Sequence, residues 1–149
     1  MGTLIKNFCS FKEPIDFNFL SKLLDNNNLE SHISSNWLNS YVFESVFKIS
    51  NVEKETFFKE IFNLLNEKYN QENKKSDLYI FFSMVSGTKS ITHKDNYDVI
   101  IIGLYGTTIY RVENEHFTVE PGDLLRIPKN VIHKAIGLTP RIILSYGIY

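Results

Sequence analysis

The second half of the chain, from Leu78 to Tyr149, alternates short apolar runs with turn signals, and this pattern limits the fold more than any other feature. Turns rich in Gly, Pro, Asn and Asp separate the runs every ~6 to 12 residues. About seven strands in about 70 residues leave no room for the helical crossovers that parallel strands need. The sequence therefore predicts an antiparallel sheet that is closed into a barrel or folded as a jelly roll. The runs are LYIFFSMV, SITHKDNYDVIIIGL, TTIYRV, HFTV, LLRIP, VIHKAI and RIILSYGIY.

The first half, residues 1–77, has a helical or irregular pattern. Apolar residues from Phe57 to Tyr69 recur at helical spacing, and Asn51 is the expected N-cap of this helix. A shorter helix is expected in PIDFNFLSKLLD, where the run Asn26 to Asn28 ends it. The segment NWLNSYVFESVFKIS fits either a strand or a loop. No linker separates the two halves, so we expect a single domain over residues 1–149, with the first part packed on the barrel of residues 78–149.

Composition excludes several classes of protein. The chain has 149 residues, which is enough to bury a core without disulfides or a structural metal. Its 16 Lys and Arg balance 17 Asp and Glu, which argues against nucleic-acid binding by bulk charge. Cys9 is the only cysteine, which suits a reducing cytoplasm. The apolar runs are far shorter than the ~20 residues of a membrane span, so we expect a cytoplasmic protein without a membrane segment.

Polar residues stand directly before the apolar run VIIIGL, in the segment HKDNYD (residues 93–98). Polar groups at the mouth of a buried strand are costly unless they are paired. Alternate residues of a strand share a face, so His93 and Asp95 are expected side by side, with Lys94 and Asp98 on the other face. An imidazole and a carboxylate inside a small barrel suit a divalent metal. A hydrogen-bonded His–Asp pair without a metal is the alternative.

A site of two His and one carboxylate, as in non-haem iron enzymes, needs one more imidazole. His133 follows EPGDLLRIPKN, in which two turns flank a short strand and reverse the chain. This hairpin is expected to return His133 to a strand beside the one that carries His93. His116 follows the polar turn ENE and is expected to face water, and His32 lies in the polar first half. The sequence therefore predicts a metal site of His93, Asp95 and His133.

With these motifs, the stretch from Leu78 to Tyr149 resembles the second half of a JmjC-type or cupin-like oxygenase, in the double-stranded β-helix group that includes the ribosomal-protein hydroxylases. The resemblance rests on THKDNYDVIIIGLYGTTIYRV and VEPGDLLRIPKNVIHKA. It implies a mainly β fold with N-terminal helices, a double-stranded β-helix of the jelly-roll, cupin-like kind. It also implies that His93, Asp95 and His133 bind Fe(II), and that 2-oxoglutarate decarboxylation is coupled to oxidation of a C–H bond.

Thr108 departs from the pattern of this family, in which a Lys usually stands two residues after the Gly of this turn and pairs with the distal carboxylate of 2-oxoglutarate. A Thr hydroxyl offers a hydrogen bond but no charge. We expect Arg141 to bind this carboxylate instead, because its planar fork suits a carboxylate and related oxygenases carry an Arg on the last strand. Further hydrogen bonds to the cosubstrate are expected from Ser90, Thr108, Tyr110 and Ser145.

Three functions are open at this point. The leading hypothesis is an Fe(II)- and 2-oxoglutarate-dependent dioxygenase that hydroxylates a small molecule or a peptide or protein side chain. Because of Thr108, a second hypothesis keeps the metal without 2-oxoglutarate, as in a cupin-type dioxygenase or isomerase. A third is a catalytically silent barrel that binds a ligand. The apolar helix from Phe57 to Tyr69 adds the expectation of a homodimer.

Overall fold

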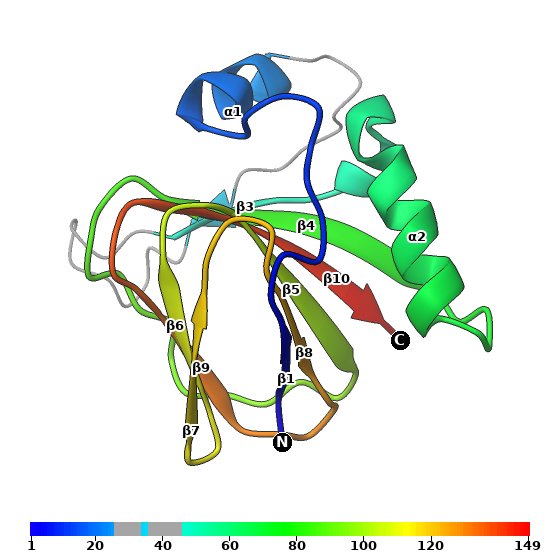
Figure 1. Cartoon of the computed structure of the whole chain (residues 1–149), viewed down its shortest axis with the longest axis vertical. Helices are drawn as coiled ribbons and strands as arrows, with labels where there is room; N and C mark the ends of the chain where they lie inside the picture. The colour runs from blue at the N-terminus through cyan, green and yellow to red at the C-terminus, as the bar shows by residue number, and fades with distance from the viewer. Residues whose placement is uncertain (26–33, 36–45) are drawn as a thin grey trace.

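Two antiparallel β-sheets that face each other form the body of the protein in its computed structural model (Figure 1). The structure describes residues 1–25, 34–35 and 46–149. The larger sheet has the strand order β1-β8-β5-β10-β4-β3-β2, and the smaller has the order β7-β6-β9. The strands are β1 (Thr3–Ile5), β2 (Ser34–Ser35), β3 (Phe47–Ile49), β4 (Ser76–Ser83), β5 (Asp98–Tyr105), β6 (Thr108–Val112), β7 (Glu115–Val119), β8 (Leu124–Ile127), β9 (His133–Gly137) and β10 (Arg141–Ile148).

Residues 87–93 extend the smaller sheet along the free edge of β9. The amide of Gly87 donates a hydrogen bond to the carbonyl of Gly137 at 2.7 Å, and His93 and His133 form a two-residue bridge at the other end. The chain therefore crosses from β4 in the larger sheet to the edge of the smaller sheet before it enters β5. With this segment the two sheets form a double-stranded β-helix, as predicted.

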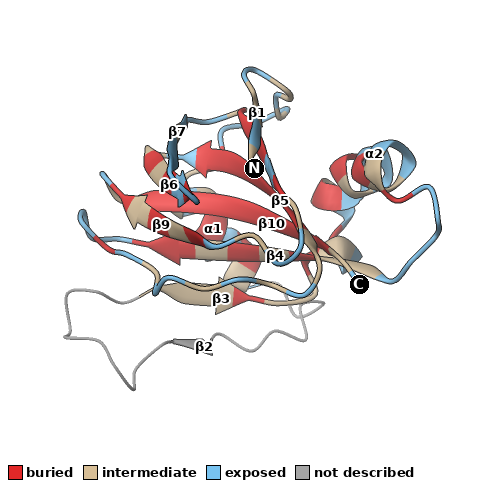
Figure 2. Cartoon of the chain, turned by 90° about the horizontal axis from the view of Figure 1, so that it is seen from below, coloured by how far each residue is buried: buried red, intermediate tan, exposed pale blue. Residues whose placement is uncertain are grey.

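The central strands β5 and β10 are buried on both faces (Figure 2). Val99 and Ile101 of β5 point into the space between the two sheets, whereas Ile100 and Ile102 point to the outer face of the larger sheet. A strand that is buried on both sides reads as a continuous apolar run, which explains the sequence VIIIGL. The same alternation on β10 directs Arg141 and Ile143 to the interior of the barrel.

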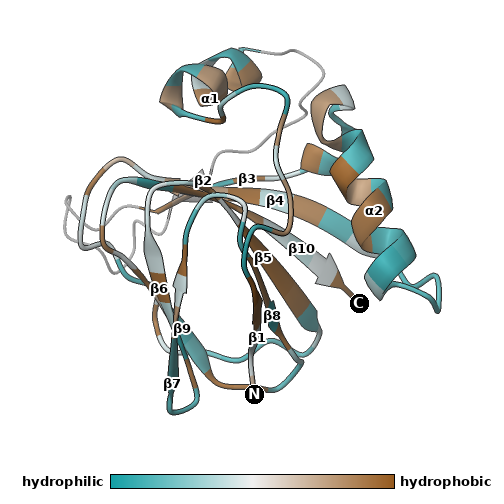
Figure 3. Cartoon of the chain, viewed as in Figure 1, coloured by the Kyte–Doolittle hydropathy of each residue, from teal (hydrophilic) through white to brown (hydrophobic). Residues whose placement is uncertain are grey.

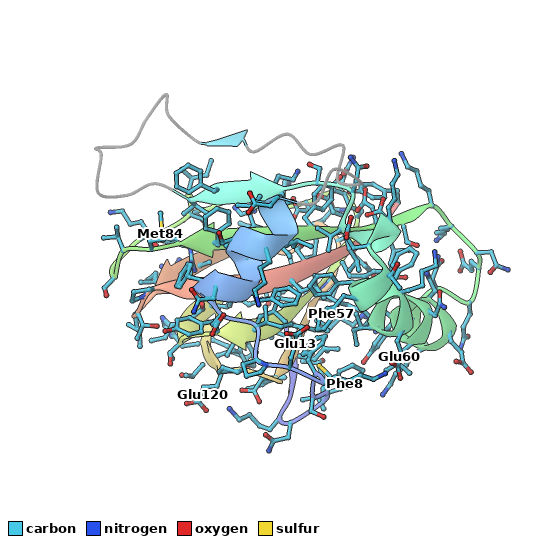
Figure 4. The ribbon with its side chains drawn as sticks, turned by 90° about the horizontal axis from the view of Figure 1, so that it is seen from above. Phe8, Glu13, Phe57, Glu60, Met84 and Glu120 are labelled. Atoms are coloured by element: carbon cyan, nitrogen blue, oxygen red, sulfur yellow. The ribbon has the colours of Figure 1, made fainter. Side chains whose placement is uncertain are left out.

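Two helices, α1 (Phe17–Leu24) and α2 (Lys59–Tyr69), cover the outer face of the larger sheet (Figure 1). Asp16 caps α1 because its Oδ1 accepts a hydrogen bond from the amide of Phe19 at 2.9 Å. Phe57 lies between the two helices (Figure 4), and its ring centroid is 4.6 Å from that of Phe19. Both helices are thereby joined to one apolar core with β4 and β10.

The apolar face of α2 is used inside the chain, because Ile61 and Leu65 are buried against the larger sheet. Its outer surface is mainly hydrophilic (Figure 3), although Leu64 is exposed. The apolar face on which the homodimer prediction was based is therefore already buried within the chain. The homodimer itself stays a prediction. Among the described residues, no helix combines the length and the apolar character that crossing a bilayer requires.

Two predictions for the first half were wrong. Thr3–Ile5 forms a strand that pairs with β8, although a helical or irregular segment was expected there. The α-helix begins at Lys59 instead of following directly on Asn51, and two short 3-10 turns, Val52–Lys54 and Thr56–Phe58, precede it. Val52 and Phe58 are both fully buried, but six residues rotate a helix by about 240°, so one continuous helix cannot direct both to the same core.

The second half corrects one further expectation. The run SITHKDNYDVIIIGL was expected to be one strand, but β5 begins only at Asp98, and residues 94–97 lie outside the named strands. The question left open for NWLNSYVFESVFKIS is answered in favour of a strand at Phe47–Ile49, which pairs with β4. Residues 36–45 of that segment, Asn26 to Asn28 and His32 lie outside the described residues.

Candidate metal centre

His93 and His133 are neighbours across the edge of the smaller sheet. The amide of His93 donates to the carbonyl of His133 at 3.0 Å, and the amide of His133 donates to the carbonyl of His93 at 2.8 Å. Their ring centroids are 4.3 Å apart. Such a backbone pair fixes the two Cβ atoms close together, so both imidazoles start from one point of the barrel mouth.

Asp95 joins the two imidazoles from the segment that leads into β5. Its Oδ2 lies 3.5 Å from Nε2 of His133 and 3.9 Å from Nε2 of His93. The backbone holds this residue in place, because its carbonyl accepts a hydrogen bond from the amide of Asn130 at 2.6 Å. One ligand atom from each of the three side chains lies within 4.8 Å of the other two. The structure therefore brings together all three residues of the predicted metal site.

Backbone carbonyls fix the orientation and tautomer of both imidazoles. Nδ1 of His93 lies 2.9 Å from the carbonyl oxygen of Ile91, and Nδ1 of His133 lies 3.0 Å from that of Val131. A carbonyl only accepts, so each Nδ1 carries the proton and each neutral ring presents a lone pair at Nε2. Burial lowers the pKa of His133, which favours this neutral form.

The three groups could hold a divalent cation. Two Nε2 lone pairs and one carboxylate oxygen converge, and acceptors that face each other repel unless a proton or a metal ion lies between them. Histidine that donates its other ring N–H to a backbone carbonyl is the usual arrangement of a metal ligand. Two imidazoles and one carboxylate on one side of an ion leave its other positions open, a set typical of non-haem Fe(II).

Other polar residues of the same region take no part in this cluster. Asp98 accepts hydrogen bonds from Arg126 Nη2 at 3.0 Å and from the amide of Lys129 at 2.9 Å. His116 is exposed on β7, as expected from the polar turn before it. Lys94 is exposed as well.

Arg141 is buried inside the barrel, with an exposed fraction of 3%. Its Nη1 is inaccessible to solvent and has no hydrogen-bond partner among the described residues. Burial lowers the pKa of this guanidinium, yet an arginine keeps its charge in a protein. An isolated buried charge is costly, so this position calls for an anion.

Gly137 on β9 makes room for the guanidinium. A Cβ at this position would lie 2.9 Å from Cδ and 3.0 Å from Nε of Arg141. Gly137 was not among the residues predicted for the site, although a glycine inside a strand is a known sign that another group approaches closely. His133, Ala135 and Gly137 share one face of β9, and the Cα atoms of His133 and Gly137 are about 13 Å apart along the strand.

The four remaining residues predicted to bind a cosubstrate differ in their surroundings. Thr108 and Tyr110 are buried on the inner face of β6, and Thr108 lies opposite Gly137 in the register of the sheet. Burial raises the pKa of Tyr110 to about 12, so its hydroxyl stays a donor. Ser145 is buried on the same side of β10 as Arg141. Ser90 differs, because its Oγ accepts a hydrogen bond from the amide of Ala135 at 2.9 Å.

Comparison with solved structures identifies the architecture. The ribosomal oxygenase YcfD from Escherichia coli, in complex with cobalt and succinic acid, matches 99% of this chain with a TM-score of 0.73 and 24% identity. The complex of YcfD with cobalt and 2-oxoglutarate matches 100% of the chain with a TM-score of 0.74 and 22% identity. The chain has the fold of a ribosomal oxygenase.

The match between this chain and the ribosomal-oxygenase fold is confined to part of that protein. A further crystal structure of YcfD has 25% identity and a TM-score of 0.71 over 99% of this chain, and the alignment covers 48% of YcfD. The chain thus spans about half the length of the ribosomal oxygenase. No protein-family model matches the sequence, and no curated protein matches it. The resemblance stated from the HxD and PGD motifs is confirmed for the fold.

Proposed function

We propose that this chain is an Fe(II)- and 2-oxoglutarate-dependent oxygenase that hydroxylates a small molecule or a peptide or protein side chain. The observation that carries the proposal is the convergence of His93, Asp95 and His133, whose ligand atoms lie within 4.8 Å of one another. In this proposal the three side chains bind Fe(II). The cobalt and 2-oxoglutarate bound to the similar YcfD support a metal ion and 2-oxoglutarate as the ligands of this site, and Fe(II) as that metal is our proposal.

Arg141 is proposed to bind the distal carboxylate of 2-oxoglutarate. Its guanidinium is buried, and in the described part of the chain Nη1 has no hydrogen-bond partner, so an incoming carboxylate would supply an acceptor and an opposite charge. Thr108 and Tyr110 lie on the neighbouring inner face of β6 and are proposed to donate hydrogen bonds to the same anion. In this proposal Arg141 takes the role of the family's Lys, which is replaced by Thr at position 108.

Each part of the chain has a definite task in the proposed reaction. When bound, Fe(II) and 2-oxoglutarate would supply the oxidation chemistry with dioxygen as the oxidant: one oxygen atom would enter the C–H bond, the other would enter succinate, and CO2 would leave 2-oxoglutarate. The carbonyls of Ile91 and Val131 keep both imidazoles in the ligand tautomer. The apolar residues between the two sheets, among them Val99 and Ile143, exclude water from the cosubstrate.

A second candidate is a metal-dependent cupin-type dioxygenase or isomerase that does not use 2-oxoglutarate. Thr108 favours it, because a neutral side chain stands where the family usually has a Lys. The two candidates differ in the role of Arg141, which has a ligand only in the first. The third hypothesis, a silent barrel, implies no metal uptake. A cytoplasmic location is part of our proposal, since Cys9 is the only cysteine and fits a reducing compartment.

The test is Fe(II)-dependent conversion of 2-oxoglutarate to succinate by the purified chain. The oxygenase proposal predicts succinate release that requires Fe(II), is lost in His93→Ala and is retained in His116→Ala, which alters an exposed imidazole. Metal binding without any succinate release would favour the second candidate. Absence of metal binding would leave the silent barrel.

A further inference from the structure

A cavity of about 420 Å³ lies beside residues 96–98, the segment that connects Asp95 to β5. Its wall includes residues 96–98, which follow Asp95 directly, and the end of α2 with the hairpin that leads into β4. Figure 1 shows this end of α2 close to the end of β10. None of the three proposed metal ligands lines the cavity. It is therefore a separate site that shares one segment with the metal centre.

Two ion pairs line the cavity, and because each joins one cation to one carboxylate, together they add no net charge. Lys74 Nζ lies 2.6 Å from Oε2 of Glu72, and Arg126 Nη2 lies 3.0 Å from Oδ2 of Asp98. Asn70 holds the hairpin in shape, since its Oδ1 accepts a hydrogen bond from the amide of Lys74 at 2.9 Å. Both pairs are partly exposed to solvent, so they contribute little to stability.

Two further cations, Lys68 and Lys129, give the cavity a positive excess. Among the described residues, neither forms an ion pair with a carboxylate. The charge of Lys129 contributes to the lowered pKa of Glu72, after the hydrogen bond and charge of Lys74, so Lys129 acts on the same space. Both side chains are exposed, and Nζ of Lys68 lies 4.9 Å from the ring centroid of Phe8, but no carboxylate of the described residues pairs with either ammonium group, so the cavity attracts an anion.

The ring of Tyr69 forms part of the cavity wall. Its hydroxyl oxygen is inaccessible to solvent, so it does not face the open cavity, and it has no hydrogen-bond partner in the described part of the chain. The lysine ammonium groups are the donors that a ligand would meet, and they suit phosphate or carboxylate oxygens.

We propose that this cavity binds the phosphate or carboxylate group of a small molecule and is the subsite for the anionic end of the oxygenase substrate. The second part rests on the proposed function. The volume lies within the ~300–1,000 Å³ of small-molecule sites. Residues 96–98 form one wall and Asp95 directly precedes them, so the cavity and the metal centre share this segment of the chain.

The first experiment titrates inorganic phosphate into the metal-free chain at constant ionic strength and follows backbone amide NMR signals. We expect saturable shifts of Asn96, Tyr97 and Lys129, and at least tenfold weaker binding in the double variant Lys68→Gln/Lys129→Gln. The control variant Lys12→Gln/Lys22→Gln removes the same charge from exposed positions outside the cavity. Absence of saturation, or equal weakening in the control, overturns the proposal.

A parallel titration with acetate distinguishes a phosphate group from a carboxylate group as the natural ligand. Tighter binding of phosphate than of acetate assigns a phosphate ester, and equal binding assigns a carboxylic acid. Both results support the anion subsite. Since no metal is present, these titrations are independent of the proposed oxygenase function.

The second experiment tests the link to the substrate. Phosphate esters, carboxylic acids and their neutral counterparts are offered with Fe(II) and 2-oxoglutarate, and succinate release is measured. We expect only anionic compounds to stimulate release, with a KM at least tenfold higher and an unchanged kcat in Lys68→Gln/Lys129→Gln. Equal reaction of the neutral counterparts overturns the subsite. A chain that binds phosphate but no Fe(II) overturns the oxygenase function and the substrate assignment, and leaves the anion site standing.

Discussion

Gly137 lies directly against the side chain of Arg141: a Cβ on residue 137 would come within 2.9 Å of Cδ and 3.0 Å of Nε. The inner face of β9 therefore leaves room for the guanidinium, whose Nη1 is buried and has no hydrogen-bond partner within residues 1–25, 34–35 and 46–149. The variant Gly137→Ala is expected to displace Arg141 and to weaken 2-oxoglutarate binding about tenfold, while Co(II) binding is retained. Isothermal titration with each ligand measures both. A loss of Co(II) affinity as large as the loss of 2-oxoglutarate affinity in Gly137→Ala would contradict the account.

Replacing Arg141 itself is expected to separate binding from stability. Arg141→Met removes a buried charge for which the described residues offer no ion-pair partner, so the metal- and ligand-free chain should gain ~1–4 kcal/mol in free energy of unfolding. The same variant should lose 2-oxoglutarate affinity by roughly 10- to 100-fold, because charge-assisted hydrogen bonds contribute ~1.5–3 kcal/mol. Chemical denaturation and calorimetric titration provide the two measurements. Arg111→Met alters an exposed arginine and should change neither quantity.

The three residues of the candidate metal site could be predicted from the sequence because a few local rules determine where they lie. The turns around Pro121 and Pro128 fold His133 back onto the sheet, and the pairing of His133 with His93 follows from that reversal. The parity argument for Asp95 gave the right neighbour from an inaccurate premise, since this residue lies before β5 and not within a strand. Its position depends on a hydrogen bond from Asn130, which is 35 residues distant in the chain (130 − 95).

Other features depend on tertiary contacts that no local pattern contains. The strand Thr3–Ile5 is recognisable only through its partner β8, since three residues carry too little periodicity. The interruption before α2 depends on two buried side chains, Val52 and Phe58, which must reach one core. The room that Gly137 leaves for Arg141 depends on how β9 and β10 face each other. The cavity beside residues 96–98 is likewise lined by residues from α2, β8 and the segment before β5.

Asp123, the aspartate of the PGD turn, is expected to stabilise the fold in a pH-dependent way. Its Oδ2 accepts hydrogen bonds from the ammonium of Lys6 and from the amide of Glu120 at 2.9 Å, and its Oδ1 accepts one from the amide of Asn7 at 3.0 Å. Burial raises the pKa of this carboxyl, but these hydrogen bonds outweigh it and lower the pKa overall. Asp123→Asn should cost ~1.5–3 kcal/mol in free energy of unfolding at pH 7.

The sign of the effect of pH on Asp123 follows from its lowered pKa. The stabilisation is complete above the pKa of ~3.9 of an unfolded aspartate and is lost as the pH falls through the lower pKa of the folded state. The difference between the original chain and Asp123→Asn should therefore shrink below about pH 4. Denaturant unfolding between pH 7 and pH 2.5 tests this. Glu67→Gln, on the exposed side of α2, should show no such trend, and a constant difference for Asp123→Asn would contradict the prediction.

Metal affinity should fall in acid because protons compete for Nε2 of both imidazoles. Burial lowers the pKa of His133 below that of a free histidine, ~6.5, so this ligand stays unprotonated to lower pH than a free imidazole. Co(II) affinity is expected to be nearly constant from pH 8 to 7 and to decrease steeply below about pH 6. Titrations at several pH values measure it. An affinity that is unchanged at pH 5 would exclude histidine ligands.

The most direct test of the metal centre is the stoichiometry of Co(II) binding to the original chain and to His93→Ala, Asp95→Ala and His133→Ala, with His116→Ala as the control. We predict one equivalent of Co(II) for the original chain and for the control, and at least a 100-fold loss of affinity in each of the three variants. Unchanged binding in any of the three, or no binding by a correctly folded original chain, would contradict the proposal that these side chains hold one metal ion.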